Sequence, residues 1–242
     1  MKKILFVFLV TLICLSSINA VQYWGEGLFA DFGFSSKTFI PKPNPLEGTV
    51  GFRKELKEIN IFSGICFDNF SFDFSASGAI NLIQLEKVHL YFGYLSHFSF
   101  SYKSEYLDDL FINDNVFFIN TKFLGKNIEN PLTVYLSLGV DLKTTSQKLS
   151  STRLAFFEPF PIFEVQLVKE IQDKHEIMFR FGTFDYLYFK GWLNTWWQMG
   201  YSYDFPKNIT LGTLFEVSYA DQITLSGALN GFQCKLFLVY RI

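Results

Sequence analysis

The end of the chain limits its possible folds more than any other segment. From Phe232 to Ile242 every second residue is apolar or aromatic, and polar residues lie at three positions between them, with Phe237 and Val239 as exceptions on the second face. This alternation predicts a β-strand with one apolar face, because successive side chains of a strand point to opposite faces. In water such a terminal strand would be an aggregation hazard. The same strand is stable in a membrane, where its apolar face contacts lipid.

The same segment resembles the C-terminal strand of bacterial outer-membrane β-barrels, which usually ends on an aromatic residue with apolar residues at every second position before it. Here the chain ends on Ile242, and Tyr240 stands two positions before it. The resemblance implies an antiparallel, up-and-down transmembrane β-barrel in the cell outer membrane. It also implies outer-membrane lipid and the outer-membrane assembly machinery as partners.

The N-terminus has the pattern of a secretory signal peptide. Lys2 and Lys3 precede an apolar run, Ile4 to Leu15, after which small and polar residues follow. The run is too short to cross a bilayer as a helix, which needs about 20 residues. We therefore expect residues 1–20 to be cleaved as a signal peptide and residues 21–242 to form one outer-membrane barrel domain.

Cys14 raises the alternative of a lipoprotein, in which the cysteine after the apolar run would be lipidated. A lipobox needs a small residue immediately before that cysteine, and Ile13 is bulky. We therefore favour the cleaved signal peptide.

Composition narrows the partners and the chemistry. The 242 residues include 31 Phe, 12 Tyr and 4 Trp, and the formal net charge is −2. So many aromatic residues on alternate positions indicate a continuous apolar outer surface, and the low charge implies no nucleic-acid partner. The sequence contains no metal-ligand spacing, phosphate-binding glycine loop or Cys-x-x-Cys motif, so no cofactor or metal is predicted.

Alternation along the chain predicts about twelve strands, although another division of residues 47–82 would give ten or fourteen. Short turns are expected near residues 58, 85–87, 126–131, 172–174 and 206–207, and longer external loops at 36–46, 104–114, 144–160, 186–194 and 220–231. Short turns on one side and long loops on the other are typical of single-chain outer-membrane barrels. The predicted strands are 27–35, 48–57, 59–67, 70–76, 88–103, 116–123, 134–142, 162–171, 177–183, 197–204, 209–219 and 232–242.

Charge and glycine distinguish the two faces of these strands. Turning the charged face outward would place Asp141, Arg180 and Glu216 in hydrocarbon, at about 2–4 kcal/mol for an Arg or Lys at the midplane and less for acids. Glycine on an inner face permits curvature and makes room for bulky neighbours. We therefore predict that the charged, glycine-rich face lines the lumen; a soluble β-protein would need the reverse. The inward glycines are Gly33, Gly51, Gly64, Gly93, Gly139, Gly182, Gly200 and Gly212.

The lumen residues carry charges of both signs, which leaves two functions open. Buried charges paired across the lumen could plug the barrel and make it a closed structural protein, which several bulky inward residues (Phe62, Met178, Phe184, Trp196, Phe237) favour. The same charges could instead line a narrow channel for small solutes and set its preference. The predicted lumen-lining residues are Asp31, Arg53, Asp73, His89, His97, Lys122, Asp141, Glu164, Arg180, Asp204, Glu216 and Lys235.

The predicted loop 144–160 suggests a further function, surface binding or adhesion. It is both basic and aromatic, and Arg153, Phe156 and Phe157 are its candidate binding residues. A loop with aromatic side chains can contact a partner or fold back into the lumen as a plug.

A lipid hydrolase is the remaining alternative. His97 and Ser99 resemble the His-x-Ser pair of outer-membrane phospholipase A, which is also a twelve-stranded barrel. In that family the pair faces lipid and is activated by an Asn. Here the alternation turns both residues inward, and Phe100 follows Ser99. His175 is expected to be a solvated turn residue. We therefore predict no catalytic residue.

Overall fold

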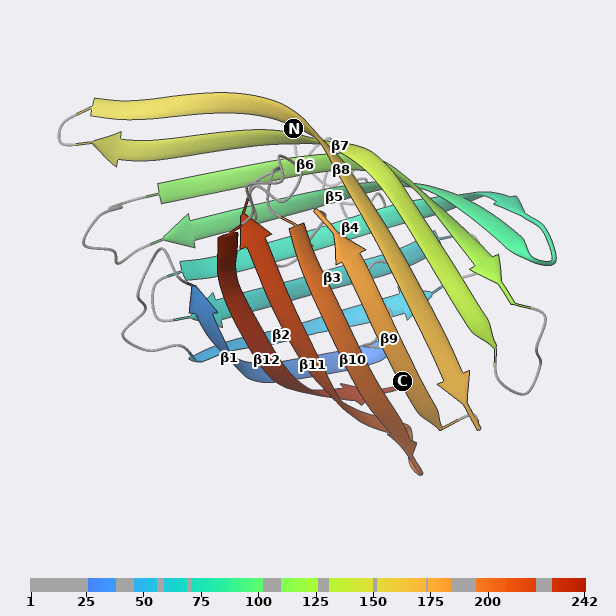
Figure 1. Ribbon diagram of the computed structural model, residues 1–242. Coiled ribbons are helices and arrows are strands. Elements are labelled where there is room, and N and C mark those ends of the chain that lie inside the picture. Colours follow the sequence, from blue (N-terminus) through green and yellow to red (C-terminus); the bar gives the residue numbers. More distant parts are fainter. Residues whose placement is uncertain are drawn as a thin grey trace, which may run out of the picture.

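The computed structural model of the chain is a closed barrel of antiparallel strands (Figure 1). Each strand pairs with its sequence neighbours, and β1 pairs with β12 to close the sheet. The structure describes residues 26–37, 46–55, 59–68, 71–101, 110–125, 131–149, 152–172, 174–183, 195–220 and 228–242. Among the described residues there is no helix long and apolar enough to cross a membrane. The predicted signal peptide lies outside the described residues.

Twelve strands form the barrel, which confirms the predicted number and the up-and-down order. They are β1 (Gly27–Lys37), β2 (Leu46–Glu55), β3 (Ile59–Asp68), β4 (Ser71–Gln84), β5 (Val88–Ser101), β6 (Leu110–Leu124), β7 (Leu132–Leu149), β8 (Thr152–Ile171), β9 (His175–Gly182), β10 (Thr195–Phe205), β11 (Ile209–Ala220) and β12 (Ala228–Tyr240).

Several strands run further than their alternation predicted. The loops expected at 104–114 and 220–231 are strand from Leu110 and from Ala228 onward. On β6 the hydrophobic pattern reverses locally, because Ile112 and Val116 are buried inside while Asn115 lies on the other face. Tyr94 donates a hydrogen bond to the Asn115 side chain at 2.5 Å, so the polar residue is accommodated there.

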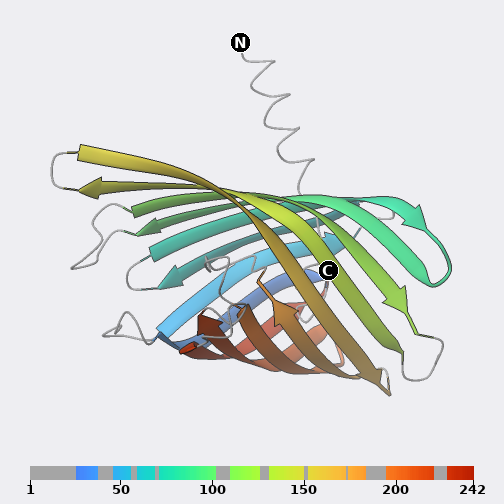
Figure 2. The same ribbon diagram turned by 45° about the horizontal axis from the view of Figure 1, so that its top comes forward.

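The largest correction concerns the loop expected at 144–160. Most of it is a β-hairpin, in which β7 and β8 remain paired out to Leu149 and Thr152. In Figures 1 and 2 the hairpin continues past the neighbouring ends of β5 and β6 and away from the barrel. Arg153, Phe156 and Phe157 therefore lie on β8 rather than in a loop.

Two prolines explain why β8 begins earlier than the sequence predicted. The backbone N–H of Phe163 turns toward β9, where it donates to Thr183 Oγ1 at 3.1 Å. Pro161 and Pro159 lie two and four positions earlier, so their nitrogens point to the same side, away from β7. Because proline lacks an N–H, it is tolerated there without loss of a β7–β8 hydrogen bond.

The outer wall is apolar and the inner wall is polar, as predicted. Leu138 and Phe215 are 67% and 47% exposed on the outside. Arg180 and Glu216, each next to an outward residue in sequence, are 1% and 4% exposed. Among the described residues 34 large hydrophobic side chains are exposed, as expected of an outer wall that faces hydrocarbon.

Inward glycines make room for aromatic rings. At Gly51 an added Cβ would lie 2.3 Å from Cζ of Phe29 on β1. At Gly212 it would lie 2.2 Å from Cζ of Phe237 on β12. Both phenylalanines are buried in the interior at 3% exposure. The sequence-based reason for placing glycine on the inner face therefore holds at these two sites.

We predict that Leu138→Arg lowers the free energy of unfolding in lipid vesicles by about 2–4 kcal/mol, because it places a charge near the bilayer midplane. A tilted strand advances about 2.5 Å per residue along the membrane normal. Leu138 is six residues from the start of β7 at Leu132, so it lies roughly 15 Å into an apolar band about 25 Å tall. Urea titration of refolded protein measures the change.

Phe157→Arg is the matched control. Phe157 is 64% exposed, close to the 67% of Leu138, but it lies fourteen residues from the end of β8 at Ile171. That distance places it beyond the apolar band, where an arginine costs about 0–1 kcal/mol. Equal losses in the two variants would contradict the proposed position of the membrane.

Candidate functional site: a charged belt inside the barrel

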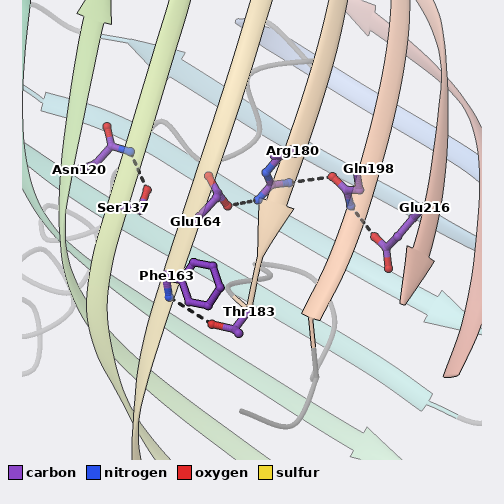
Figure 3. A network of polar contacts seen from close by, with 8 residues as sticks. All are labelled: Asn120, Ser137, Phe163, Glu164, Arg180, Thr183, Gln198 and Glu216. Carbon is purple, nitrogen blue, oxygen red and sulfur yellow. Dashed lines mark hydrogen bonds and ion pairs between the residues drawn. The ribbon is translucent and has the colours of Figure 1, made fainter. Parts of the chain in front are cut away.

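A chain of charged and amide side chains runs around part of the inner wall. We call Glu164, Arg180, Gln198 and Glu216 the belt; they lie on the consecutive strands β8, β9, β10 and β11 (Figure 3). Arg180 is the register partner of Gln198, which is the partner of Glu216. Glu164 is opposite Gly182, one inward position further along β9.

Each belt residue bonds to the next one. Arg180 Nη2 forms an ion pair with Glu164 Oε2, and Arg180 Nη1 donates to Gln198 Oε1 at 3.1 Å. The amide nitrogen of Gln198 then donates to Glu216 Oε2. A single arginine is thus bonded to one glutamate directly and connected to a second through an amide.

The belt is buried. Its four side chains are 1–4% exposed, and the Arg180 guanidinium lies 4.5 Å from the ring centroid of Trp196, which is 0% exposed. Stacking of a guanidinium on an indole stabilises the cation, and the ion pair offsets part of the cost of removing both charges from water. Breaking such a pair is expensive, because one charge is left buried without its partner.

A second ion pair lies on the inner wall where the barrel closes. Lys235 Nζ of β12 is 3.2 Å from Asp31 Oδ1 of β1, and both side chains are buried. Ion pairs across the lumen were one sequence-based expectation. This pair and the Glu164–Arg180 pair instead join neighbouring strands along the wall.

Two further predicted lumen residues lie together on the other side of the barrel. Asp141 on β7 interacts with His97 on β5 and is hydrogen-bonded to Asp114 on β6. Lys143 also interacts with Asp141, and all four side chains are at most 9% exposed. Asp114 and Lys143 were missed because the predicted strands stopped short of them.

The remaining candidates are more dispersed. Arg53 is buried at 4% exposure, and the Lys122 ammonium lies 5.6 Å above the ring of Tyr135. His89 shares a hydrogen bond of 3.1 Å with the hydroxyl of Tyr91. The side chains of Asp73, Arg153 and Phe156 lie outside the described part of the chain.

Asp204 belongs to a half-exposed network at the end of the barrel that carries the C-terminus. Arg241 donates to both of its carboxylate oxygens at 2.7 and 2.6 Å, and the hydroxyl of Thr210 donates at 2.6 Å. The side chains of Arg241 and Asp204 are 46% and 29% exposed. This network anchors the last strand to the turn between β10 and β11.

His175 was predicted to be a solvated turn residue, but it lies on a strand and not in the turn. It begins β9, and its Nδ1 is 2.8 Å from the hydroxyl of Tyr201. Its ring also lies edge-on to Tyr203 at 4.9 Å. The cluster lies on the wall that carries the aromatic outer residues, where rings that are both polar and apolar suit a membrane boundary. His97 faces the lumen at 1% exposure, so it does not face lipid as in the phospholipase.

Sequence reasoning selected the charged members of the belt but not its one amide, Gln198, nor Gln166, the register partner of Arg180 on β8. Gln198 and Gln166 fall on the inward phase of β10 and β8, and both are buried. The lumen candidates were chosen mainly by formal charge, which leaves out glutamines. A choice of every inward residue whose side chain can form hydrogen bonds would have included both. Among the described residues no group of three His, Cys, Asp or Glu side chains could hold a metal ion.

The fold is similar to that of solved porins. The NanC porin superposes with a TM-score of 0.61 at 13% identity, over 89% of this chain and 100% of that chain. The KdgM porin gives a TM-score of 0.55 at 9% identity, over 88% and 99%. A KdgM porin in complex with disordered oligogalacturonate gives 0.55 at 8%, over 89% and 99%. At these identities the similarity establishes the shared fold. No family model matches the sequence, and neither does any curated protein.

We predict that Arg180→Met lowers the free energy of unfolding by about 3–5 kcal/mol, because Glu164 remains buried without its partner. Arg241→Met is the control. Arg241 also pairs with a carboxylate, but its side chain is 46% exposed, so the loss should be at most about 1 kcal/mol. Urea titration in vesicles measures both. Similar losses in the two variants would contradict the burial of the belt.

Proposed function

We propose that the protein is an outer-membrane channel for small polar solutes and that the belt forms its constriction. The single observation that carries the proposal is the belt itself: one arginine and two glutamates held on the inner wall of a barrel whose outer wall is apolar. Charged rings on an inner wall set solute preference in narrow pores. The shared fold with porins supports the same reading.

Stability alone gives little reason for charges at these positions. Replacing a buried ion pair by apolar residues of similar volume is often neutral or stabilising. The interior already accepts large apolar groups, since Trp196, Met178 and Phe237 are buried there at 0–3% exposure. If the interior served only to fill the barrel, large apolar side chains could therefore occupy all of these positions.

The channel is proposed to be narrow. Twelve strands enclose more space than the filled eight-stranded barrels and less than the open sixteen-stranded porins. The bulky inward side chains reduce that space further. Passage is therefore proposed for solutes of the size of single sugars, amino acids or ions.

A closed structural barrel is the second candidate, and burial favours it. Inner-wall residues on opposite sides of the barrel, such as Thr49 on β2 and Gln166 on β8, are 0% exposed. Residues that line a wide water-filled channel would be exposed to water. If the belt never separates, the protein serves as a membrane-embedded scaffold.

The location belongs to the same proposal. An apolar outer wall and a porin-like fold support insertion into outer-membrane lipid by the assembly machinery for such barrels. Export is proposed to use the N-terminal signal peptide, which is removed after Ala20. Surface binding by the β7–β8 hairpin stays a prediction, and exposed Phe157 is its described candidate residue.

We predict that refolded protein in planar bilayers gives discrete single-channel steps with a preference for cations. Glu216→Gln should lower that preference, because it removes a negative charge from the belt; reversal potentials in a KCl gradient measure it. Glu26→Gln is the control, since the Glu26 side chain is 42% exposed beside Lys54 at the end of the barrel. Absence of steps from correctly folded protein would reject the channel and favour the closed barrel.

We also predict that protein isolated from outer membranes begins at Val21. Intact-mass measurement and N-terminal sequencing test this directly. A chain that retains residues 1–20, or one lipidated at Cys14, would contradict the proposed export route.

A further inference from the structure

Gln166 is an exception in a row of interacting side chains. Successive register partners on β6 to β11 form the row Lys122, Tyr135, Gln166, Arg180, Gln198 and Glu216. On one side of Gln166, Arg180 bonds to Gln198 and Gln198 bonds to Glu216. On the other side, the Lys122 ammonium lies 5.6 Å over the Tyr135 ring.

The amide of Gln166 takes no part in these contacts. The residue is 0% exposed, and neither its Nε2 nor its Oε1 has a hydrogen-bond partner among the described residues. A buried amide without partners costs free energy, whereas an apolar side chain of the same shape would not. Gln166 therefore does not stabilise this arrangement of the lumen through its amide.

We propose that Gln166 is the hydrogen-bonding residue of a binding site for a neutral sugar inside the lumen. The inference rests on the proposed channel function for its biological role. A primary amide both donates and accepts, so it can bond two adjacent hydroxyl groups of one sugar ring. Tyr135, the register partner of Gln166 on β7, is itself buried at 1% exposure, and its ring would pack against the apolar side of the sugar once the inner side chains separate.

Charge favours a neutral solute over an acidic one. Arg180, the other register neighbour of Gln166, is already paired with Glu164 and stacked on Trp196. Binding a carboxylate there would require the Glu164 ion pair to break. A hydroxyl group makes no such demand. Because Gln166 is fully buried, the sugar reaches the amide when the inner side chains separate during passage.

The test compares one substitution at two glutamines. Gln166→Met and Gln198→Met both replace a buried inner-wall amide, at 0% and 3% exposure, by an apolar chain of similar length. Only Gln198 bridges Arg180 and Glu216. Refolded protein is titrated with glucose, maltose and glucuronate by isothermal calorimetry, and unfolding temperature is read from the gel shift between unboiled and heated samples.

We expect glucose or maltose to bind the native chain and to bind Gln166→Met roughly tenfold or more weakly, as loss of hydrogen bonds to a ligand implies. The unfolding temperature of Gln166→Met should equal or exceed that of the native chain, whereas the unfolding temperature of Gln198→Met should be lower. Sugar affinity unchanged in Gln166→Met, no saturable sugar binding to the native chain, or an equal fall in both unfolding temperatures would each overturn the proposal. Tighter binding of glucuronate than of glucose would overturn the neutral class.

These measurements do not depend on conductance. Sugar binding by a protein that gives no single-channel steps would reject the proposed channel while the binding site stands. Channel steps from a protein that binds neither sugar would reject the proposed binding site, while the proposed channel stands.

Discussion

Closure of the sheet is the constraint on which the rest of the structure depends. Hydrocarbon offers no hydrogen bonds to backbone groups, so a sheet that spans a membrane must leave no open edge. The register between β1 and β12, from Leu28 opposite Tyr240 to Lys37 opposite Gly231, provides that closure. It also brings Asp31 and Lys235 together inside the wall. The last strand, which first indicated a barrel, is thus one of the two that complete it.

Closure creates an interior that differs from the core of a soluble protein. The apolar side chains are used on the outer wall, so the interior holds charges, amides, glycines and some bulky aromatic residues. The belt shows how such an interior is stabilised: one arginine is satisfied by a glutamate, an amide and an indole at once. Gln166 lies in the same row and makes no such bonds within the described residues, which sets it apart from the residues that hold the wall together.

The β7–β8 hairpin and His175 show where local pattern misleads. Prolines at 159 and 161 normally interrupt a strand, yet here their nitrogens point away from the paired neighbour, and β8 continues. His175 follows charged turn residues, yet a hydrogen bond to Tyr201 places it among outer aromatic rings. In both cases the deciding partner lies on another strand. The strand count and the two faces could be predicted because each depends on alternation within a single strand.

The sequence by itself determined the class of fold, the approximate number of strands and the side of each strand that faces lipid, since the cost of a charge in hydrocarbon acts on every residue separately. Only the tertiary structure decided which inner residues meet. Register between strands placed Arg180 beside Gln198 and grouped Asp114 with Asp141. Pairing depends on the relative positions of strands distant in sequence. Alternation within one strand carries no information about such positions.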